Sequence, residues 1–330
     1  MKICIIKLGA DGDVLRTLPI AKAIKTKYPD SKISLITKGD IAELLTGMSY
    51  LDEILEIPYQ GTTIFDILYN FDIEDEATTL AMKIKAGKKY GFCSDGGYPS
   101  VFNSGSEYYL NTIFDDELKK SNRKTYQEMM FEVAELPYNK ENYEIVLNEK
   151  DINYASNYAN KNNIQGNHLI GIHMGASSRW PSKAWHEDKV KEFILKANEK
   201  GYKVILFGGP NETTKHNSLY IDLRKKKVNL FINNPNNTKR EFAAVVSLCS
   251  SMICSDSFAL HVSIGLKKPT VGLFFCTSPY EVEGYGILKK IVSPLINQFF
   301  PEKMDEYNEK LVNSISIDEV LNAIEQINPR

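Results

Sequence analysis

The sequence predicts an α/β protein built from two doubly wound domains, each around a parallel β-sheet. Short runs rich in Ile, Val and Leu alternate with longer stretches of helical periodicity, and this alternation predicts right-handed βαβ units. A strongly polar stretch interrupts the alternation near the middle of the chain, after which it resumes. The length of 330 residues agrees with two domains of ordinary size.

The first half begins with the apolar run "KICIIK", a predicted strand, and continues with an amphipathic helix that ends at Pro29. The helix over 77–87 is expected to end at Gly87, and the Gly-, Ser- and Tyr-rich region from 93 to 120 is less regular. In order, the predicted strands cover 2–7, 32–37, 51–57 and 64–71, and the predicted helices cover 15–29, 40–48, 77–87 and 124–136.

The second half restarts with "LIGIHMG", a predicted strand that runs into a loop. Gly201 marks the end of the first helix, and Thr238 and Glu241 stand in capping-box spacing at the start of another. The predicted strands cover 169–175, 202–209, 251–254 and 268–275, and the predicted helices cover 183–201, 238–250 and 257–265.

The boundary between the two domains is expected in the polar region 139–167. The first domain is expected over 1–150 and a linker over 151–167. The second domain is expected over 168–312, followed by a C-terminal helix within 313–330.

Composition argues against several classes of protein. The net charge of -2, from 40 basic and 42 acidic side chains, lacks the basic excess of a dedicated nucleic-acid binder. The five cysteines are odd in number and show no C-x-x-C spacing, which indicates free thiols in a reducing compartment and no metal site. Neither a signal peptide nor a membrane-spanning run is visible, so the protein is expected in the cytoplasm.

The first candidate motif is "GADGD", between the first strand and the first helix. Gly9 and Gly12 would let a ligand approach the backbone closely, while the carboxylates of Asp11 and Asp13 would repel a phosphate. Two interpretations stay open at this point: Asp11 or Asp13 caps the helix, or Asp13 is a carboxylate base whose charge is stabilised by the helix N-terminus.

The second motif is "HMGASSRWPSKAW", again between a strand and a helix. Hydroxyl and cationic groups precede the start of the helix, and such a set could bind a diphosphate. These residues are Ser177, Ser178, Arg179 and Lys183. An ordinary N-terminal loop with both tryptophans in the core explains the same residues.

The third motif is "CSDSFALH". Ser257 and His261 are four residues apart and share one helix face, and Asp256 precedes them at the turn. These residues either face an anion bound at the helix start or are helix caps and a core histidine.

The fourth motif is "GGPNE" at the end of a strand. Gly208 and Gly209 permit close backbone approach, and Glu212 could accept hydrogen bonds from ribose hydroxyls. A plain surface turn fits the same residues.

These motifs, in this order, resemble glycosyltransferase family 9, the family of bacterial lipopolysaccharide heptosyltransferases. The segments that carry the resemblance span nearly the whole chain: "IIKLGADGDVLRTLP", "FDILYNF", "GKKYGF", "IHMGASSRWPSKAW", "VILFGGPNE" and "CSDSFALHVSIGLKKPTVGLF".

The resemblance implies the GT-B architecture of two Rossmann-like domains facing a central cleft, with the C-terminal helix crossing back to the first domain. It implies inverting transfer of a heptose or similar sugar from an ADP-sugar co-substrate, without a cofactor or catalytic metal. The implied acceptor is a saccharide such as the lipopolysaccharide core, with no nucleic-acid partner and with peripheral contact at the inner membrane surface.

Residue by residue, Asp13 resembles the general base that deprotonates the acceptor, and Gly9, Asp11, Gly12 and Arg16 form the acceptor-side loop. The donor-binding positions implied are Ser177, Ser178, Arg179 and Lys183 at the diphosphate, Gly208, Gly209 and Glu212 at the ribose, and Asp256, Ser257, Phe258 and His261 on the second phosphate side. Six cations of the first domain are either contacts for a phosphorylated acceptor or solvated surface charge: Lys88, Lys89, Lys119, Lys120, Arg123 and Lys124.

The chain departs from the family pattern at Arg16, where His is common, at Ser178, where Lys is common, and at Phe258, where Gly is common. These departures leave the sugar open, so another nucleotide-sugar donor or a protein acceptor remains an alternative. An epimerase of the same architecture is disfavoured by the single acidic loop at Asp13, and a nicotinamide-dependent dehydrogenase by the missing G-x-G-x-x-G. A non-catalytic nucleotide-sugar-binding protein is the alternative from another class.

Overall fold

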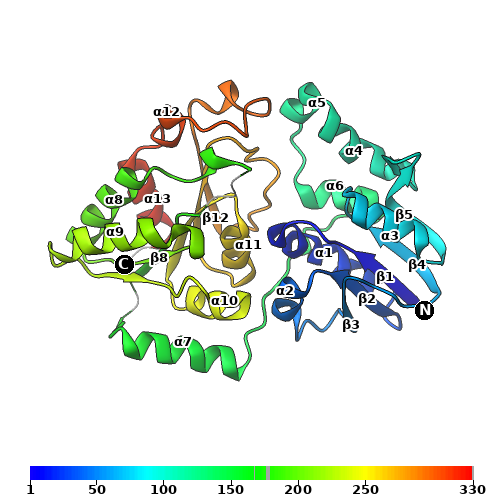
Figure 1. Ribbon diagram of the computed structural model, residues 1–330, viewed down its shortest axis with the longest axis horizontal. Coiled ribbons are helices and arrows are strands. Elements are labelled where there is room, and N and C mark those ends of the chain that lie inside the picture. The colour runs from blue at the N-terminus through cyan, green and yellow to red at the C-terminus, as the bar shows by residue number, and fades with distance from the viewer. Residues whose placement is uncertain (167, 176–178, 329–330) are drawn as a thin grey trace. The chain divides into compact units, whose positions relative to one another are not determined.

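The computed structural model describes residues 1–166, 168–175 and 179–328, which form two compact units (Figure 1). Unit 1 contains Met1–Val146 and Tyr280–Glu283, and unit 2 contains Leu147–Pro279 and the chain from Gly284 onward. The end of the first stretch of unit 1 lies close to the expected boundary at residue 150. The short segment Tyr280–Glu283 returns to unit 1, where the Glu281 carbonyl accepts a hydrogen bond from the Tyr126 N–H at 2.9 Å.

Unit 1 is a six-stranded sheet in the order β3-β2-β1-β4-β5-β6, parallel except for the antiparallel edge strand β6. Ile3, Cys4, Ile5 and Ile6 of β1 are fully buried, as expected for a central parallel strand covered on both faces. The strands are β1 (Lys2–Ile6), β2 (Lys32–Thr37), β3 (Glu53–Glu56), β4 (Phe65–Asn70), β5 (Ala86–Asp95) and β6 (Tyr98–Val101).

The order of the strands reverses beside β1, since β2 lies on one side and β4 on the other. Ligands of doubly wound sheets bind at the carboxyl ends of the strands at such a reversal. In unit 1 this is where the loops after β1 and β4 leave the sheet. The helices are α1 (Asp11–Lys27), α2 (Gly39–Ala42), α3 (Asp75–Lys83), α4 (Glu107–Phe114), α5 (Asp116–Ser121) and α6 (Tyr126–Val133).

Unit 2 repeats the design with a fully parallel sheet in the order β12-β11-β10-β7-β8-β9. Its order reverses between β7 and β10, so the loops after these two strands are the expected ligand-binding loops. The strands are β7 (Leu169–His173), β8 (Lys203–Phe207), β9 (Leu230–Ile232), β10 (Ser251–Ser255), β11 (Thr270–Phe274) and β12 (Leu288–Val292).

Several helices of unit 2 pack against this sheet. Helix α10 begins with the predicted capping box: Thr238 Oγ1 accepts from the Glu241 N–H at 3.2 Å, and the Glu241 carboxylate accepts from the Thr238 N–H at 3.0 Å. The helices are α7 (Glu149–Lys161), α8 (Glu187–Glu199), α9 (Thr213–Arg224), α10 (Lys239–Ser247), α11 (Phe258–Gly265), α12 (Glu309–Val312) and α13 (Ile317–Ile327).

Two predictions about the organisation of the chain differ from the structure. Most of the expected linker 151–167 is helix α7, which belongs to unit 2 and packs against α10. Its Asp151 makes a buried ion pair with Arg240, so a sequence that looks polar throughout still has one buried face. The C-terminal helix α13, expected to cross back to the first domain, packs instead against α8, β11 and β12 of unit 2.

Local predictions also need adjustment in two places. Helix α3 ends at Lys83, and Gly87 lies in strand β5, where a Cβ would come 3.0 Å from the Asp66 carbonyl oxygen. The region 93–120, expected to be irregular, holds the end of β5, the strand β6 and the helices α4 and α5. The prediction of free thiols is confirmed, because all five cysteines are free, and all are buried.

Candidate functional site

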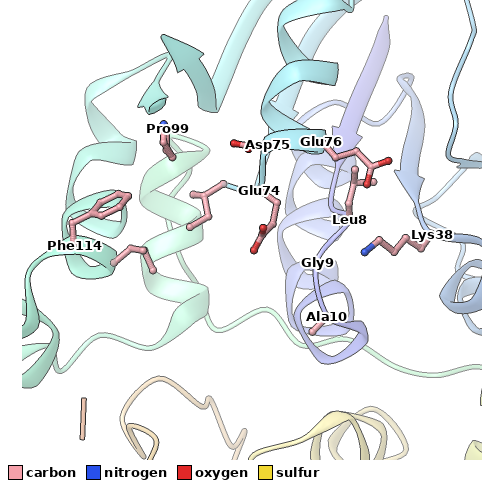
Figure 2. Close-up of a pocket in the computed structure, with 11 residues that line it drawn as sticks. Leu8, Gly9, Ala10, Lys38, Glu74, Asp75, Glu76, Pro99 and Phe114 are labelled. Carbon is pink, nitrogen blue, oxygen red and sulfur yellow. The ribbon is translucent and has the colours of Figure 1, made fainter. Parts of the chain in front are cut away.

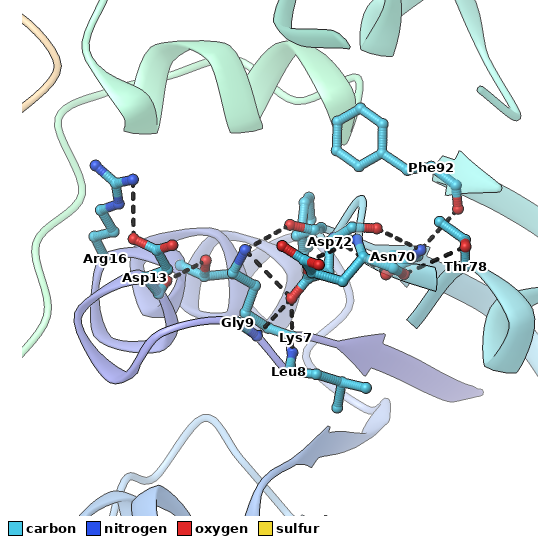
Figure 3. Close-up of polar contacts among 12 residues, drawn as sticks. Lys7, Leu8, Gly9, Asp13, Arg16, Asn70, Asp72, Thr78 and Phe92 are labelled. Carbon is cyan, nitrogen blue, oxygen red and sulfur yellow. Dashed lines mark hydrogen bonds and ion pairs between the residues drawn. The ribbon is translucent and has the colours of Figure 1, made fainter. Parts of the chain in front are cut away.

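The loop after β1 carries the candidate residues of unit 1. Asp72, which follows β4, anchors this loop: its Oδ2 accepts from the backbone N–H of Leu8 at 3.0 Å and of Gly9 at 2.5 Å (Figure 3). Asn70 fixes Asp72 in turn, since its side-chain amide donates to the Asp72 carbonyl at 2.9 Å and its Oδ1 accepts from the Asp72 N–H at 3.1 Å. The entrance to α1 is therefore held by the neighbouring strand.

Asp13 lies in the first turn of α1. The N-cap residue is Ala10, which makes no side-chain cap bond, so neither Asp11 nor Asp13 is the N-cap residue. Asp13 Oδ1 forms an ion pair with Arg16 at 2.9 Å, and 34% of the Asp13 side chain stays exposed (Figure 3). The helix N-terminus and Arg16 both stabilise negative charge on an accessible carboxylate. Gly12, in the same turn, is buried.

Arg16 is positioned by an aromatic ring from α6. Its guanidinium carbon lies 3.8 Å from the centroid of Tyr126, a cation–π contact on a fully buried residue. The Tyr126 hydroxyl lies 3.0 Å from Thr17 Oγ1, which donates to the Asp13 carbonyl at 2.7 Å. Arg16 is thus packed into the fold rather than free on the surface.

Lys7 is a charged residue of this site that the sequence analysis did not single out. Its ammonium donates to the Phe71 carbonyl at 2.9 Å and lies 3.6 Å from Asp72 Oδ2, and only 4% of the residue is exposed. Burial alone lowers the pKa of Lys7, but Tyr126 and Asp72 outweigh burial and raise this pKa above its ordinary value. The one sequence signal was the abrupt lysine at the end of an apolar strand.

In unit 2, three residues predicted to bind the nucleotide-sugar come together at the reversal of strand order between β7 and β10. The Lys183 ammonium lies 3.3 Å from Asp256 Oδ2 and donates to the Asp256 carbonyl at 3.1 Å. His261 Nε2 lies 3.9 Å from Asp256 Oδ1 on the other side. Lys183 precedes α8 and Asp256 precedes α11, so the fold joins the second and third sequence motifs.

Ser257 and Phe258 begin helix α11. Ser257 is its N-cap residue, and its hydroxyl donates to the Ser255 carbonyl at 3.1 Å and lies 3.4 Å from His173 Nδ1. The Phe258 ring packs against Phe242 of α10 with centroids 5.6 Å apart. The Phe258 side chain is therefore packed on an aromatic neighbour at the helix start.

The fourth motif forms a tight turn after β8. Glu212 Oε2 accepts from the Gly209 N–H at 2.8 Å, and the Gly208 N–H donates to the buried Asn233 Oδ1 at 3.1 Å. A Cβ on Gly208 would lie 2.7 Å from the His216 ring, so only glycine fits there without a shift. The predicted glycine has a steric reason, and Asn233 and His216 are its unpredicted partners.

Two histidines behind this turn are kept neutral by their surroundings. Burial, together with the charge of His216, lowers the pKa of His173 to about 4, and burial lowers the pKa of His216 to about 4. His173 stands first in the quoted second motif, but nothing in the spacing distinguished it from a core residue.

The diphosphate motif is only partly visible. Ser177 and Ser178 lie outside the described residues. Arg179 lies with its guanidinium carbon 4.7 Å from the Trp180 ring centroid. Among the described residues, no three His, Cys, Asp or Glu side chains gather as metal ligands would. None of the described helices has both the length and the apolar composition of a membrane span.

Comparisons with known proteins identify a family for this chain. The family model described as glycosyltransferase family 9 (heptosyltransferase) matches residues 62–312. Lipooligosaccharide heptosyltransferase 2 of Haemophilus ducreyi is 22% identical over 355 residues, covering 99% of this chain and 99% of the relative.

Solved structures show the same fold. A glycosyl transferase family 9 protein from Veillonella parvula superposes with a TM-score of 0.78 at 19% identity, covering 99% of this chain and 96% of that one. The structure titled E. coli ADP-heptose lps heptosyltransferase II gives 0.73 at 16% identity, covering 99% and 98%. The predicted α/β fold of two Rossmann-like, GT-B-type domains is confirmed. Because the family model covers well over half of its residues, the chain belongs to glycosyltransferase family 9 and is a glycosyltransferase.

Proposed function

We propose that this protein transfers heptose from ADP-heptose to a saccharide acceptor of the lipopolysaccharide core, with inversion and with Asp13 as general base. Family membership and the names of the relatives support the sugar, the donor and the acceptor. The observation that carries the proposed mechanism is the Asp13 carboxylate: it is accessible, paired with Arg16, and placed at the N-terminus of α1 at the strand-order reversal of unit 1.

The proposed reaction is a single displacement. Asp13 accepts the proton of an acceptor hydroxyl, and that oxygen forms a bond to the anomeric carbon while the bond from this carbon to the diphosphate oxygen breaks. ADP leaves with the bonding electrons, and Asp13 later gives its proton to solvent. General-base assistance of this kind contributes roughly 10²–10⁴ in rate.

The leaving diphosphate needs positive charge, and we assign this task to unit 2. Lys183 carries an ammonium, and the free backbone N–H groups at the start of α11 carry the positive end of the helix dipole. With these groups facing the departing phosphates, the reaction would need no catalytic metal. Glu212 would bind the ribose, and Arg179, Ser177 and Ser178 would complete the diphosphate loop.

The acceptor belongs to unit 1 in this proposal, around Gly9, Asp11, Gly12 and Arg16. A lipid-linked core saccharide would bring the enzyme to the cytoplasmic surface of the inner membrane as a peripheral protein. Another nucleotide-sugar donor or a protein acceptor is the competing version of the same chemistry. Phe258 is the residue that most directly favours this alternative.

The experiment is a donor panel. Purified protein is incubated with ADP-, GDP- and UDP-sugars and a cell-envelope extract, and nucleoside diphosphate release is measured with and without EDTA. We expect extract-dependent ADP release from ADP-heptose that persists in EDTA, with a product of inverted anomeric configuration by NMR. Release from a different donor alone would contradict the sugar assignment. Loss of activity in EDTA would contradict the metal independence, and a product of retained configuration would contradict the single displacement.

A further inference from the structure

Unit 1 contains a cavity to which the proposed reaction assigns no role. It is an open cavity of about 560 Å³ at the carboxyl edge of the sheet, bounded by the loops after β1, β2 and β4, the start of α3, and β6 and α4 (Figure 2). Its volume falls in the range of roughly 300–1,000 Å³ that is usual for small-molecule sites. Gly9 and Ala10 form one wall, four and three residues before Asp13.

The opposite wall of the cavity is apolar. Phe114, at the end of α4, is 68% exposed and stands with Pro99 across from the Gly9–Ala10 loop (Figure 2). Ile113, next to Phe114 in the chain, also lines the cavity. An exposed aromatic ring over a cavity offers a flat surface to the C–H face of a sugar ring. Leu8 and Ile73 add to the apolar lining.

The charged groups of the cavity are mostly acidic. Glu74, Asp75 and Glu76 line it, against one cation, Lys38. Figure 2 shows Glu74 between Phe114 and the Gly9–Ala10 loop, in the space that a ligand would fill. Across the described ranges, none of these four side chains has a hydrogen bond or an ion pair, so all four are available to a ligand.

This charge balance opposes a phosphate. Three carboxylates repel a dianion, and one lysine does not offset them. The cations considered in the sequence for a phosphorylated acceptor are not in the cavity lining, and several have other partners: Lys89 donates to the Ala81 carbonyl at 2.8 Å, and Lys124 pairs with Glu132 at 2.6 Å.

From the cavity, its aromatic wall and its free carboxylates, we propose that this cavity binds a non-phosphorylated sugar unit of the acceptor, whose hydroxyls donate to Glu74. Phe114 packs on the ring, and the unit leads the reactive hydroxyl along the Gly9–Ala10 loop toward Asp13. This inference rests on the proposed function for the role of the sugar as acceptor, but binding to the cavity is measurable without any transfer.

The test is saturation-transfer NMR on the full chain, without a donor. The probes are methyl glycosides of glucose, mannose and galactose, each as the neutral sugar and as its 6-phosphate. At least one neutral glycoside is expected to receive saturation, and its 6-phosphate is expected to receive much less. Glu74→Gln is expected to weaken binding about tenfold, in line with the loss of a charge-assisted hydrogen bond, and Phe114→Ala severalfold.

Asp30→Asn, at an exposed carboxylate elsewhere in unit 1, is the matched control and is expected to bind as the wild type does. Stronger binding of the 6-phosphates, no binding of any neutral glycoside, or unchanged binding in both cavity variants would overturn the proposal. A protein that binds neutral glycosides but releases no ADP from ADP-heptose would contradict the proposed function and leave the cavity assignment standing.

Discussion

Asp72 is the residue on which the candidate base depends most, although it would never touch substrate. Its carboxylate holds the Leu8 and Gly9 N–H groups and faces the buried Lys7 ammonium. A buried charge that loses its partner is costly, typically about 3–5 kcal/mol, whereas removing both charges costs far less. The Lys7–Asp72 pair therefore predicts a strongly non-additive pair of substitutions.

Asp72→Asn is expected to destabilise unit 1 by about 3 kcal/mol, because Asn keeps an acceptor for the loop but leaves Lys7 without a counter-charge. The double variant Lys7→Met with Asp72→Asn should recover much of that loss. Hydrogen exchange of peptides covering β1 and β4 measures both. Additive effects of the two single substitutions would show that the pair is not coupled.

The two neutral histidines of unit 2 predict a pH dependence of its stability. The pKa of each is about 4 in the folded protein, against an ordinary value near 6.5. Below pH 6.5 the unfolded chain gains protons that the folded unit does not, so stability is lost as the pH falls toward 4. Each histidine contributes about 1.4 kcal/mol per pH unit in that window.

Both tryptophans, Trp180 and Trp185, lie in unit 2, so their fluorescence in urea follows the unfolding of this unit. The urea midpoint should decrease as the pH is lowered from 6.5 to 4.5. The decrease should be smaller in His216→Gln, because this variant lacks one of the two histidines. Equal slopes for the variant and the wild type would mean that His216 is already solvated in the folded protein.

At the scale of elements, the turn after β8 shows how a glycine motif is fixed by packing. A Cβ on Gly208 would meet the His216 ring at 2.7 Å and Glu212 Cβ at 2.8 Å, while the nearest atom to a Cβ on Gly209 is 3.7 Å away. Two adjacent glycines in one motif therefore have different requirements.

Gly208→Ala is expected to cost about 1–3 kcal/mol, since the turn must shift to admit the methyl group. Gly209→Ala is the matched control and should stay within about 1 kcal/mol of the wild type. The readout is urea unfolding followed by tryptophan fluorescence. If Gly208→Ala were as stable as Gly209→Ala, the close approach to His216 would not constrain the turn.

The secondary structure was predictable where the pattern is strong and local. The sequence predicts the β1 strand, the α10 capping box and the strands beside both strand-order reversals correctly, because each depends on neighbouring residues in the sequence. Helix α7 is not predicted, although Asn148 and Asp151 form a local capping box at its start. Its polar composition hides a face whose burial depends on the long-range Asp151–Arg240 pair. The path of α13 depends on which helices and strands it packs against, and that too is tertiary information.

The same distinction applies to the site. Asp13, Lys183, Asp256 and Glu212 stand in recognisable motifs, so the sequence pointed to them. Their partners Asp72, Tyr126 and His216 stand in no such motif. They lie elsewhere in the sequence and reach the site only when the chain folds.

At the scale of the whole molecule, the chain uses one design twice. Each unit is a doubly wound sheet whose strand order reverses once, and each places its candidate residues at that reversal. The two sites differ in charge: an acidic helix start at Asp11 and Asp13 in unit 1, and a cation beside the start of α11 in unit 2. This asymmetry matches a reaction in which one substrate loses a proton and the other releases a diphosphate.

The most direct test of that account is the turnover of Asp13→Asn beside Asp11→Asn, two isosteric changes in the same helical turn. With ADP-heptose and the envelope extract, Asp13→Asn is expected to lower kcat by roughly 10²–10⁴ with ADP affinity unchanged, while Asp11→Asn stays near the wild type. If Asp13→Asn turned over like the wild type, or if both variants lost activity equally, Asp13 would not be the base.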